Sequence, residues 1–360
     1  MHSNHGQSQT LLVYSISAAN LYGTERVAID TLVAFARERN VVLIAPRGPA
    51  VDLARSKGVT THTYGSLFEK ARLLFSLSWR NRRMRFITIS VVDSYLYFIV
   101  RALQLKSLRH VHVIHGSGFP ARSYVSKRYL RGVPVDVVAV SDYTRERLCE
   151  FSGLPPARVA VIENFVSAAQ LQQSQARGSY TNGGRIRRVI TISRVEKPKR
   201  VDLLLDALER HPELREFSFE VFGAGPELEP LIARAKAANI PATQLTFHGF
   251  QPNVSARIHE FDVLLHLCPI EPFGIVYLEA MSAGVVAVGP DRGSKVLTDN
   301  RTGFLFKADD ADSLGETLLK VRNLDAAALD RVASAAHEEL RTRYSEGRAV
   351  IEYRKAIETT

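Results

Sequence analysis

Two glutamates interrupt an otherwise apolar stretch, "PIEPFGIVYLEAMSAG", at positions 271 and 279. Glu271 follows "DVLLHLCPI", a run with the composition of a buried strand, and Pro272 favours a helix that begins immediately afterwards. Glu279 then falls inside that helix, beside Ile275 and Leu278. A carboxylate in such surroundings costs roughly several kcal/mol unless it is hydrogen-bonded. A ligand rich in hydroxyl groups would satisfy both acids; a surface helix with two incidental acids is the alternative.

The same segment offers backbone N–H groups at the expected start of that helix, around Phe273, Gly274 and Ile275. The first N–H groups of a helix lack partners within it and carry a partial positive charge, so they bind anions. The segment therefore predicts carboxylates for sugar hydroxyls and amides for a phosphate, side by side.

A cationic turn, "ISRVEKPKRVD", follows another strand-like run and contains Arg194 and Lys199, together with Lys197 and Arg200. A guanidinium gives bidentate contacts to phosphate, and an ammonium gives a compact charge. Both offset the negative charge that builds on a leaving diphosphate. A solvated basic turn without a ligand is equally compatible with the sequence.

The N-terminal half carries two further candidates. Gly23, in "SAANLYGTERVAID", lies between a strand and a helix, where a backbone can approach a phosphate closely. His115 ends the run "RHVHVIHG" and is expected beyond the end of a strand. His110 and His112 share a strand face, but no third ligand accompanies them, and Asp310 is expected to cap a helix. We predict no metal site, and the absent G-x-G-x-x-G pattern disfavours a nicotinamide dinucleotide site.

Elements that would position these residues alternate along both halves of the chain, strand-like runs with amphipathic helical patterns. The sequence predicts an α/β protein with two Rossmann-like doubly wound domains facing each other across a cleft, where ligands bind beyond the carboxyl ends of the strands. The predicted organisation is an N-terminal domain over 1–166, a polar linker over 167–185, a C-terminal domain over 186–344, and a last helix over 345–360 that could cross back to the N-terminal domain.

The positive charge is unevenly distributed. The chain has 360 residues and a net charge of +10, and residues 1–166 hold 22 Lys and Arg against 11 Asp and Glu, a net of +11. This excess indicates that the first half faces a polyanion, either nucleic acid or an anionic membrane surface. Two cysteines and a polar N-terminus without a secretion pattern favour a reducing cytosol. The apolar run 86–100 is too short to span a bilayer and is interpreted as a buried strand followed by a helix.

Taken together, these motifs resemble the family 4 (group 1) retaining glycosyltransferases of the GT-B fold, from about Leu11 to Phe306. The strongest match is the pair Glu271 and Glu279 in "EPFGIVYLEAMSAG", followed by "TDNRTGFLF". Supporting matches, in order, are "YGTERV", "VIHG", "AVSDYTRERL", "VIENF", "ISRVEKPKRVDLLLDAL", "FGAGPELEPL" and "FHGFQPNV".

The resemblance implies a metal-independent hexosyltransferase that moves a sugar from a UDP- or GDP-sugar to a glycolipid, lipopolysaccharide or exopolysaccharide acceptor, with the nucleotide sugar as substrate and no cofactor. It implies that Glu279 holds the ribose and Glu271 the donor sugar, and that His115 lies near the transferred sugar. Arg194 and Lys199 would stabilise the leaving diphosphate. The other implied donor-binding positions are Gly23, Phe273, Gly274, Ile275 and Phe250, the last as a wall of the base pocket.

Three departures from the family pattern concern the donor side. Arg200 stands where the family usually has glycine after the lysine, Val286 stands in place of a proline, and the following Gly-Gly-x-x-Glu loop is shortened to "DRGSKVL". Because that loop lies near the donor sugar in relatives, the resemblance does not identify the sugar.

The basic half also combines apolar and cationic residues, as in "EKARLLFSLSWRNRRMR" and "RSYVSKRYLRG". This composition favours contact with anionic lipid headgroups at the inner face of the cytoplasmic membrane. It also suits nucleic acid, but no recognised nucleic-acid motif accompanies it, and a helix with a solvated basic side is the plainer alternative. The rival functions are a GT-B-fold sugar-nucleotide epimerase or hydrolase, which would need no acceptor, and a catalytically silent binding module.

Overall fold

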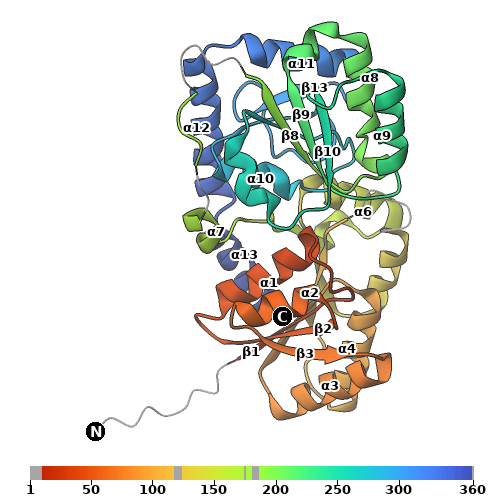
Figure 1. Ribbon diagram of the computed structural model, residues 1–360. Helices are drawn as coiled ribbons and strands as arrows, with labels where there is room; N and C mark the ends of the chain where they lie inside the picture. Colours follow the sequence, from red (N-terminus) through yellow and green to blue (C-terminus); the bar gives the residue numbers. More distant parts are fainter. Residues whose placement is uncertain (1–9, 117–123, 174–175, 181–185, 359–360) are drawn as a thin grey trace. The chain divides into compact units, whose positions relative to one another are not determined.

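The computed structural model describes residues 10–116, 124–173, 176–180 and 186–358. The chain divides into two compact units, one formed by Met1–Ser167 with Glu346–Thr360 and the other by Ala168–Ser345. Each unit is a parallel β-sheet with helices on both faces (Figure 1). This confirms the predicted class, two doubly wound α/β domains.

The first unit has a seven-stranded sheet in the order β3-β2-β1-β4-β5-β6-β7, with every neighbouring pair parallel. Its strands are β1 (Leu11–Ser15), β2 (Asn40–Pro46), β3 (Thr60–Tyr64), β4 (Met84–Thr88), β5 (His110–Ile114), β6 (Val135–Ala139) and β7 (Val159–Val161). Its helices are α1 (Gly23–Phe35), α2 (Pro49–Ser56), α3 (Leu67–Arg80), α4 (Val91–Leu103), α6 (Asp142–Ser152) and α13 (Glu346–Glu358), with short 3-10 turns η1 (Ser126–Gly132) and η2 (Pro156–Arg158).

Local chemistry explains these elements. β1 and β5 are buried over their whole length, as expected of central strands covered on both faces. α3 and α6 begin at serine caps, Ser66 and Ser141, whose side chains accept a backbone N–H of the first turn. The apolar run 86–100 forms the end of β4 and most of α4, as predicted. None of the described helices is both long and apolar enough to cross a bilayer.

The last helix, α13, belongs to the first unit although it ends the chain. It packs against α1 and β5, and ion pairs join Arg348 to Glu163 at 2.8 Å and Arg354 to Glu38. These contacts come from residues about 185 and 316 positions apart in the sequence.

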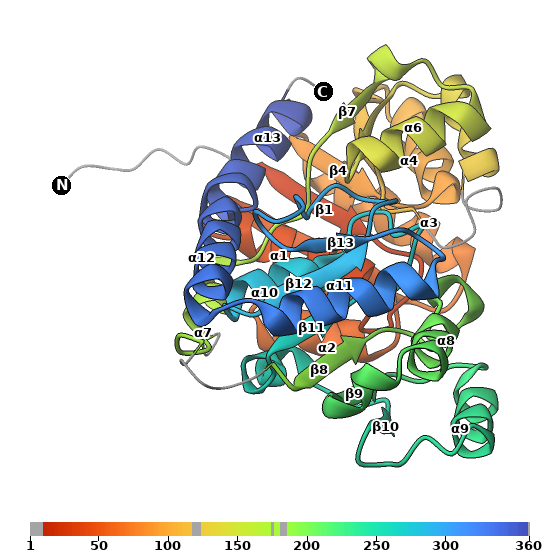
Figure 2. The same cartoon turned by 90° about the horizontal axis from the view of Figure 1, so that it is seen from above.

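The second unit has a six-stranded parallel sheet in the order β10-β9-β8-β11-β12-β13. Its strands are β8 (Arg188–Ile192), β9 (Ser218–Phe222), β10 (Leu245–Gly249), β11 (Val263–Leu265), β12 (Val286–Pro290) and β13 (Phe304–Phe306). Its helices are α7 (Ala168–Gln173), α8 (Asp202–Arg210), α9 (Leu228–Ala237), α10 (Ile275–Ser282), α11 (Ala311–Asn323) and α12 (Ala326–Arg343), with 3-10 turns η3 (Lys197–Lys199), η4 (Pro212–Glu216) and η5 (Val254–Glu260). Helices α8 and α11 pack side by side (Figure 2).

Two details of this unit bear on the sequence predictions. Asp310 caps α11 by accepting the N–H groups of Asp312 and Ser313, as expected. The described part of the predicted linker contains α7 and Tyr180, which is buried in the core of the second unit. The Tyr180 hydroxyl donates to the Asp262 carbonyl at 2.8 Å and accepts the Val286 N–H at 2.9 Å.

Candidate functional site

The candidate site of the second unit lies where its strand order changes direction. β8 and β11 are parallel neighbours, so the loops that follow them leave the same edge of the sheet. Arg194 and Lys199 follow β8, and His266 and Glu271 follow β11. Ligands of open parallel sheets bind at such switch points. The fold therefore brings the predicted cations and the first predicted carboxylate together.

Glu271 is held by two donors at one of its oxygens. Lys199 Nζ donates to Oε2 at 2.6 Å, and His266 Nε2 lies 3.1 Å from the same oxygen. Burial alone would raise the pKa of Glu271, but the charge of Lys199 and the hydrogen bond from His266 hold it below its usual range. The other oxygen, Oε1, has no hydrogen-bond partner in the part of the chain that the structure describes. Glu271 is thus a fixed carboxylate with one oxygen available to a ligand.

Lys199 is the matching cation. Burial alone would lower the pKa of its ammonium, but the charges of Glu271 and Cys268 and the hydrogen bond to Glu271 together outweigh this effect and raise the pKa. The side chains of Lys199 and Glu271 are each 16% exposed, so the pair is largely desolvated without being sealed from solvent. His266 completes the group, and the sequence analysis missed it, because a histidine inside an apolar strand-like run gives no signal of its partner.

The turn that carries Lys199 depends on close backbone contacts. Val195 N–H donates to the Ala224 carbonyl at 3.0 Å, and Ser193 N–H donates to the Phe222 carbonyl at 3.1 Å. Gly223, with φ of 145°, permits this approach, because a Cβ there would lie 1.8 Å from the Ser193 carbonyl oxygen. The turn at Gly223 is therefore structural and positions the cationic loop.

Arg200 explains one departure from the family pattern. It has a φ of 51°, the left-handed region that glycine adopts without steric cost. Its side chain forms ion pairs with Asp202 at 3.2 Å and with Asp309. An arginine here thus keeps the backbone conformation of the turn and adds two contacts.

α10 begins at Ile275, two residues later than predicted. Gly274 precedes it with φ of 85°, so the chain turns through a left-handed residue before entering the helix. A Cβ at position 274 would lie 2.6 Å from the Tyr277 ring, which explains the glycine. Phe273 is 3% exposed and contacts the Tyr344 ring rather than opening the helix. Of the three predicted phosphate donors, only the Ile275 N–H lies in the first turn of α10, and those of Phe273 and Gly274 precede the helix.

The shortened loop after β12 supports the Glu271 segment. Ser294 N–H donates to the Glu271 carbonyl at 2.9 Å, and the Ser294 hydroxyl donates to the Phe273 carbonyl. Gly293, with φ of 92°, lies against the Glu271 backbone, where a Cβ would come within 3.0 Å of its carbonyl oxygen. The loop that departs most from the family therefore fixes the segment that carries the central carboxylate.

Two other predicted donor positions lie further out. Glu279 is on the second turn of α10 and is half-buried. Phe250 follows β10 and is 69% exposed. Their predicted roles, at the ribose and at the base, stay predictions.

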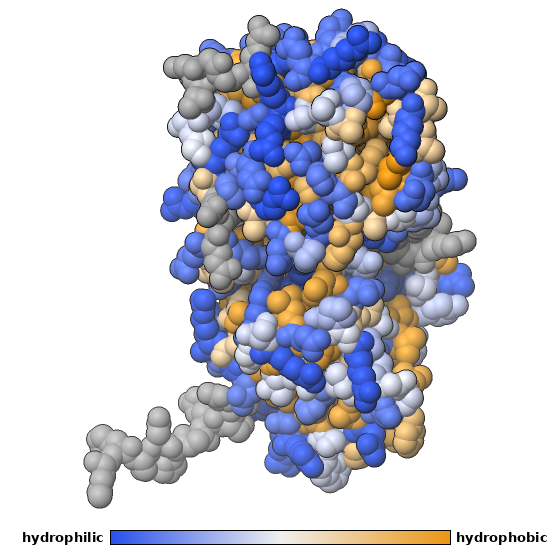
Figure 3. Space-filling view, viewed as in Figure 1, coloured by the Kyte–Doolittle hydropathy of each residue, from blue (hydrophilic) through white to orange (hydrophobic). Residues whose placement is uncertain are grey.

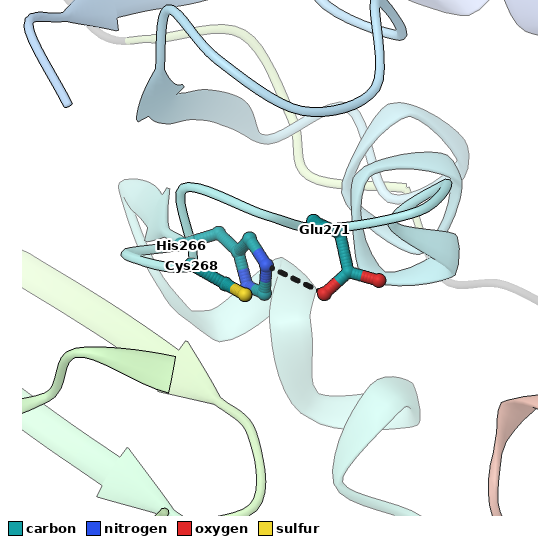
Figure 4. A group of neighbouring side chains, drawn as sticks. All are labelled: His266, Cys268 and Glu271. Atoms are coloured by element: carbon teal, nitrogen blue, oxygen red, sulfur yellow. Dashed lines mark hydrogen bonds and ion pairs between the residues drawn. The ribbon is translucent and has the colours of Figure 1, made fainter. Parts of the chain in front are cut away.

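His266, Cys268 and Glu271 form a group whose ligand atoms lie within 4.8 Å of one another (Figure 4). The Glu271 carboxylate already pairs with the Lys199 ammonium, so a cation occupies its side of the group before any metal binds. Burial also raises the pKa of the Cys268 thiol to about 11, which disfavours the thiolate that a metal binds. These residues fit a metal poorly, and the prediction that none is needed stands as a prediction.

The first unit holds the remaining predicted residues. Gly23 is the first residue of α1, directly after the loop that follows β1, as expected. His115 follows β5, and its Nε2 is buried without a hydrogen-bond partner in residues 10–116, 124–173, 176–180 and 186–358. Burial lowers the pKa of His115 to about 4, so the ring is neutral near pH 7.

Two family models match consecutive parts of the chain. The model described as "Glycosyltransferase Family 4" matches residues 22–170, and "Glycosyl transferases group 1" matches residues 173–338. The first match lies in the first compact unit except for its last three residues, and the second match lies wholly in the second unit; together they cover most of the sequence.

Individual relatives agree with these matches. The chain is 28% identical over 258 residues to the phosphatidylinositol N-acetylglucosaminyltransferase gpi3 subunit of Schizosaccharomyces pombe, which covers 68% of this chain and 54% of that protein. The aligned segments of the curated relatives span less than two thirds of their lengths.

Solved structures share the fold. Anabaena Alr3699/HepE in complex with UDP-glucose has a TM-score of 0.81 at 15% identity, covering 97% of this chain and 100% of that one. The lipopolysaccharide outer core galactosyltransferase WaaB in its apo form has a TM-score of 0.74 at 18% identity, covering 97% and 99%.

Proposed function

We propose, from the premise that this chain belongs to the family 4 (group 1) glycosyltransferases and has the GT-B fold, that it transfers a sugar from a UDP- or GDP-sugar to a glycolipid, lipopolysaccharide or exopolysaccharide acceptor with retention of configuration. The observation that carries the proposal is the Lys199–Glu271–His266 group at the switch point of the second sheet. The glycolipid class is supported by the relatives named for phosphatidylinositol and lipopolysaccharide.

The group supplies the two interactions that the transfer needs. Glu271 presents Oε1 to a hydroxyl of the donor sugar, while Lys199 and His266 hold Oε2 and fix the carboxylate in place. Arg194 and Lys199 provide the positive charge for the leaving diphosphate, and the first-turn N–H groups of α10 add neutral donors. Glu279 binds the ribose in this proposal, and His115 assists at the transferred sugar.

The chemical step needs no protein nucleophile. The bond between the anomeric carbon and the diphosphate oxygen breaks as the acceptor hydroxyl attacks from the same face. The acceptor proton passes to the leaving phosphate oxygen, so atoms and charge balance. Because negative charge develops on the diphosphate, preorganised cations stabilise this transition state more than the ground state.

A lipid-facing surface on α3 supports a membrane-associated acceptor. Phe68, Phe75 and Trp79 are 78%, 42% and 65% exposed, and their spacing of seven and four residues puts them on one side of the helix. Phe75 and Trp79 stack with ring centroids 6.0 Å apart. Figure 3 shows apolar side chains at the surface where α3 and α4 lie. By contrast, Leu74, which lies in the same basic and apolar stretch, is fully buried in the core.

A donor panel tests the function. The protein is incubated with UDP-, GDP- and ADP-sugars, with and without a membrane lipid extract, and nucleotide release and sugar products are measured. The proposal expects nucleotide release that depends on the extract, with labelled sugar in the lipid fraction. Epimerised or free sugar produced without the extract identifies the epimerase or hydrolase and overturns the proposal.

A further inference from the structure

A second cationic group lies in the first unit, beside His115, which the proposed function places near the transferred sugar. Lys127, on η1, points its Nζ to the end of β4, where it donates to the Ile89 carbonyl at 3.1 Å, and it lies 3.3 Å from His112 Nε2. His112 is fully buried in β5, and its Nδ1 lies 2.9 Å from the Ser94 hydroxyl on α4. Since an ammonium only donates, His112 Nε2 accepts from Lys127 and Nδ1–H donates to Ser94.

His115 adds an unsatisfied polar atom within the range of the Lys127 charge. It follows β5 three residues after His112, and its Nε2 is buried and lacks a partner within the described ranges. The charge of Lys127 acts on both histidines and adds to burial in lowering their pKa values. Both rings are therefore neutral near pH 7, and the group carries one positive charge on Lys127.

Among the residues that the structure describes, no carboxylate forms an ion pair with Lys127. The sequence contains no Asp or Glu from Ser94 to Val135, but seven Lys and Arg residues. The acid on α4, Asp93, is committed to Lys70, whose Nζ lies 2.6 Å from its carboxylate. Burial lowers the pKa of Lys127 to about 8, with no anion to raise it. A desolvated ammonium without a counter-ion is costly, and an anionic ligand would relieve that cost.

We propose that Lys127 Nζ and His115 Nε2 bind a phosphate group of the acceptor. Phosphate oxygens accept hydrogen bonds from both an ammonium and an imidazole N–H. α4, which carries Ser94 in this group, also exposes Ile99 and Leu103, which are 51% and 73% exposed. The same helix thus contributes to the proposed phosphate site and to an apolar surface, and a lipid with a phosphate headgroup would need both. The inference rests on the proposed function, because it assigns the acceptor's headgroup.

The test uses the full chain labelled with ¹⁵N-histidine and titrated with inorganic phosphate. Imidazole signals of His112 and His115 are followed by NMR and assigned with a His115→Asn variant. The inference expects saturable shifts in the wild type and at least tenfold weaker binding in Lys127→Gln, whose amide can still donate to the Ile89 carbonyl. Arg128→Gln is the matched control, since Arg128 is exposed on the same turn and should bind phosphate as the wild type does.

Two further measurements show which molecule carries the bound phosphate group, and they distinguish failure of this inference from failure of the proposed function. Short-chain phosphatidic acid that binds more tightly than phosphate assigns a lipid headgroup, and equal binding assigns a soluble phosphorylated acceptor. The inference is overturned if the His115 signals do not shift with either ligand, or if they shift as much in Lys127→Gln as in the wild type. If sugar transfer to the lipid extract persists in that case, the proposed function stands; if phosphate binds but no donor is used, the function fails and the anion site remains.

Discussion

Glu271 is the residue on which the proposed donor chemistry depends. Its Oε2 is fixed by Lys199 and His266, so Oε1 is presented in one orientation rather than many. Preorganisation of this kind contributes to rate because the charges need not reorganise when the leaving group develops its charge. Glu279, on α10, lies outside this group of contacts. The two glutamates should therefore respond differently to substitution.

Glu271→Gln keeps the size of the side chain and removes its charge. We expect turnover to fall by roughly 10²–10³-fold, the usual scale for losing one preorganised electrostatic contact, with nucleotide binding little changed. Glu279→Ala should instead weaken nucleotide binding roughly tenfold, by about the free energy of one hydrogen bond to a charged group. Initial rates and nucleotide titrations by calorimetry measure both, and unchanged kinetics in both variants would remove the assigned roles.

The sequence predicted the residues of this group better than their contacts. Glu271, Lys199 and Arg194 were identified from residue type and from their place after strands. His266 was not, because its partner is five residues away across a loop whose shape the sequence does not reveal. Lys127 was likewise one cation in a basic stretch until the structure showed its Nζ beside His112.

At the scale of elements, β5 concentrates buried histidines. His110 is 1% exposed and packs at a tilt against the rings of Phe86 and Tyr97, and burial lowers its pKa to about 4. The unfolded chain binds a proton near the ordinary value of 6.5, whereas the folded chain does not bind one until about pH 4. The contribution of His110 to the free energy of unfolding is therefore fully present above pH 6.5 and is lost as the pH falls towards 4.

This linkage gives a pH prediction. At pH 5 we expect His110 to cost roughly 2 kcal/mol of unfolding free energy relative to pH 7. Urea unfolding at the two pH values measures the loss, which should be smaller by about that amount in His110→Phe. His259→Phe, on a half-exposed turn of the second unit, should keep the wild-type loss. An equal loss in His110→Phe and the wild type would show that His110 is protonated when folded.

The turn at Arg200 gives a second prediction at this scale. Arg200→Gly removes a left-handed non-glycine residue, which costs about 1–2 kcal/mol, but it also removes the partly exposed ion pairs with Asp202 and Asp309. We expect the two effects to nearly cancel, with unfolding free energy within about 1 kcal/mol of the wild type and turnover retained. A large drop in the melting temperature of Arg200→Gly would mean that the two ion pairs stabilise the turn by more than the left-handed arginine costs.

Element boundaries show where sequence reasoning stops. The alternation of strands and helices followed from composition, and the strand-then-helix interpretation of 86–100 was correct. The start of α10 was placed two residues early, because Pro272 favours a helix start but does not reveal that Gly274 adopts a left-handed conformation. Tyr180 lay in a stretch too polar to predict a core residue, yet it is buried in the second unit.

At the scale of the whole molecule, the excess positive charge belongs to residues 1–166, which also carry the exposed aromatic residues of α3. We propose that this charge brings the protein to an anionic surface, where the aromatic side chains enter the headgroup region. This combination supports a membrane-bound acceptor on the first unit, whereas the proposed donor group belongs to the second unit.

Vesicle binding tests this arrangement. Phe68→Asp combined with Trp79→Asp should weaken binding to anionic vesicles by roughly tenfold or more. Each change removes apolar area that would be buried in the headgroup region and adds a negative charge that the anionic lipids repel. Flotation with anionic and zwitterionic vesicles provides the measurement. Ile351→Asp is the control, since Ile351 is 52% exposed on α13 and should not matter. Equal flotation of the double variant and the wild type would exclude α3 as the contact.

The central claim is that the Lys199–Glu271–His266 group drives sugar transfer from a nucleotide diphosphate donor. The most direct test is the transfer of labelled sugar to a membrane lipid extract, compared between the wild type and Glu271→Gln at saturating donor. We predict transfer by the wild type that requires the extract and a roughly 10²–10³-fold slower rate in the variant. Equal rates in both proteins, or sugar turnover by the wild type that does not require the extract, would contradict the account.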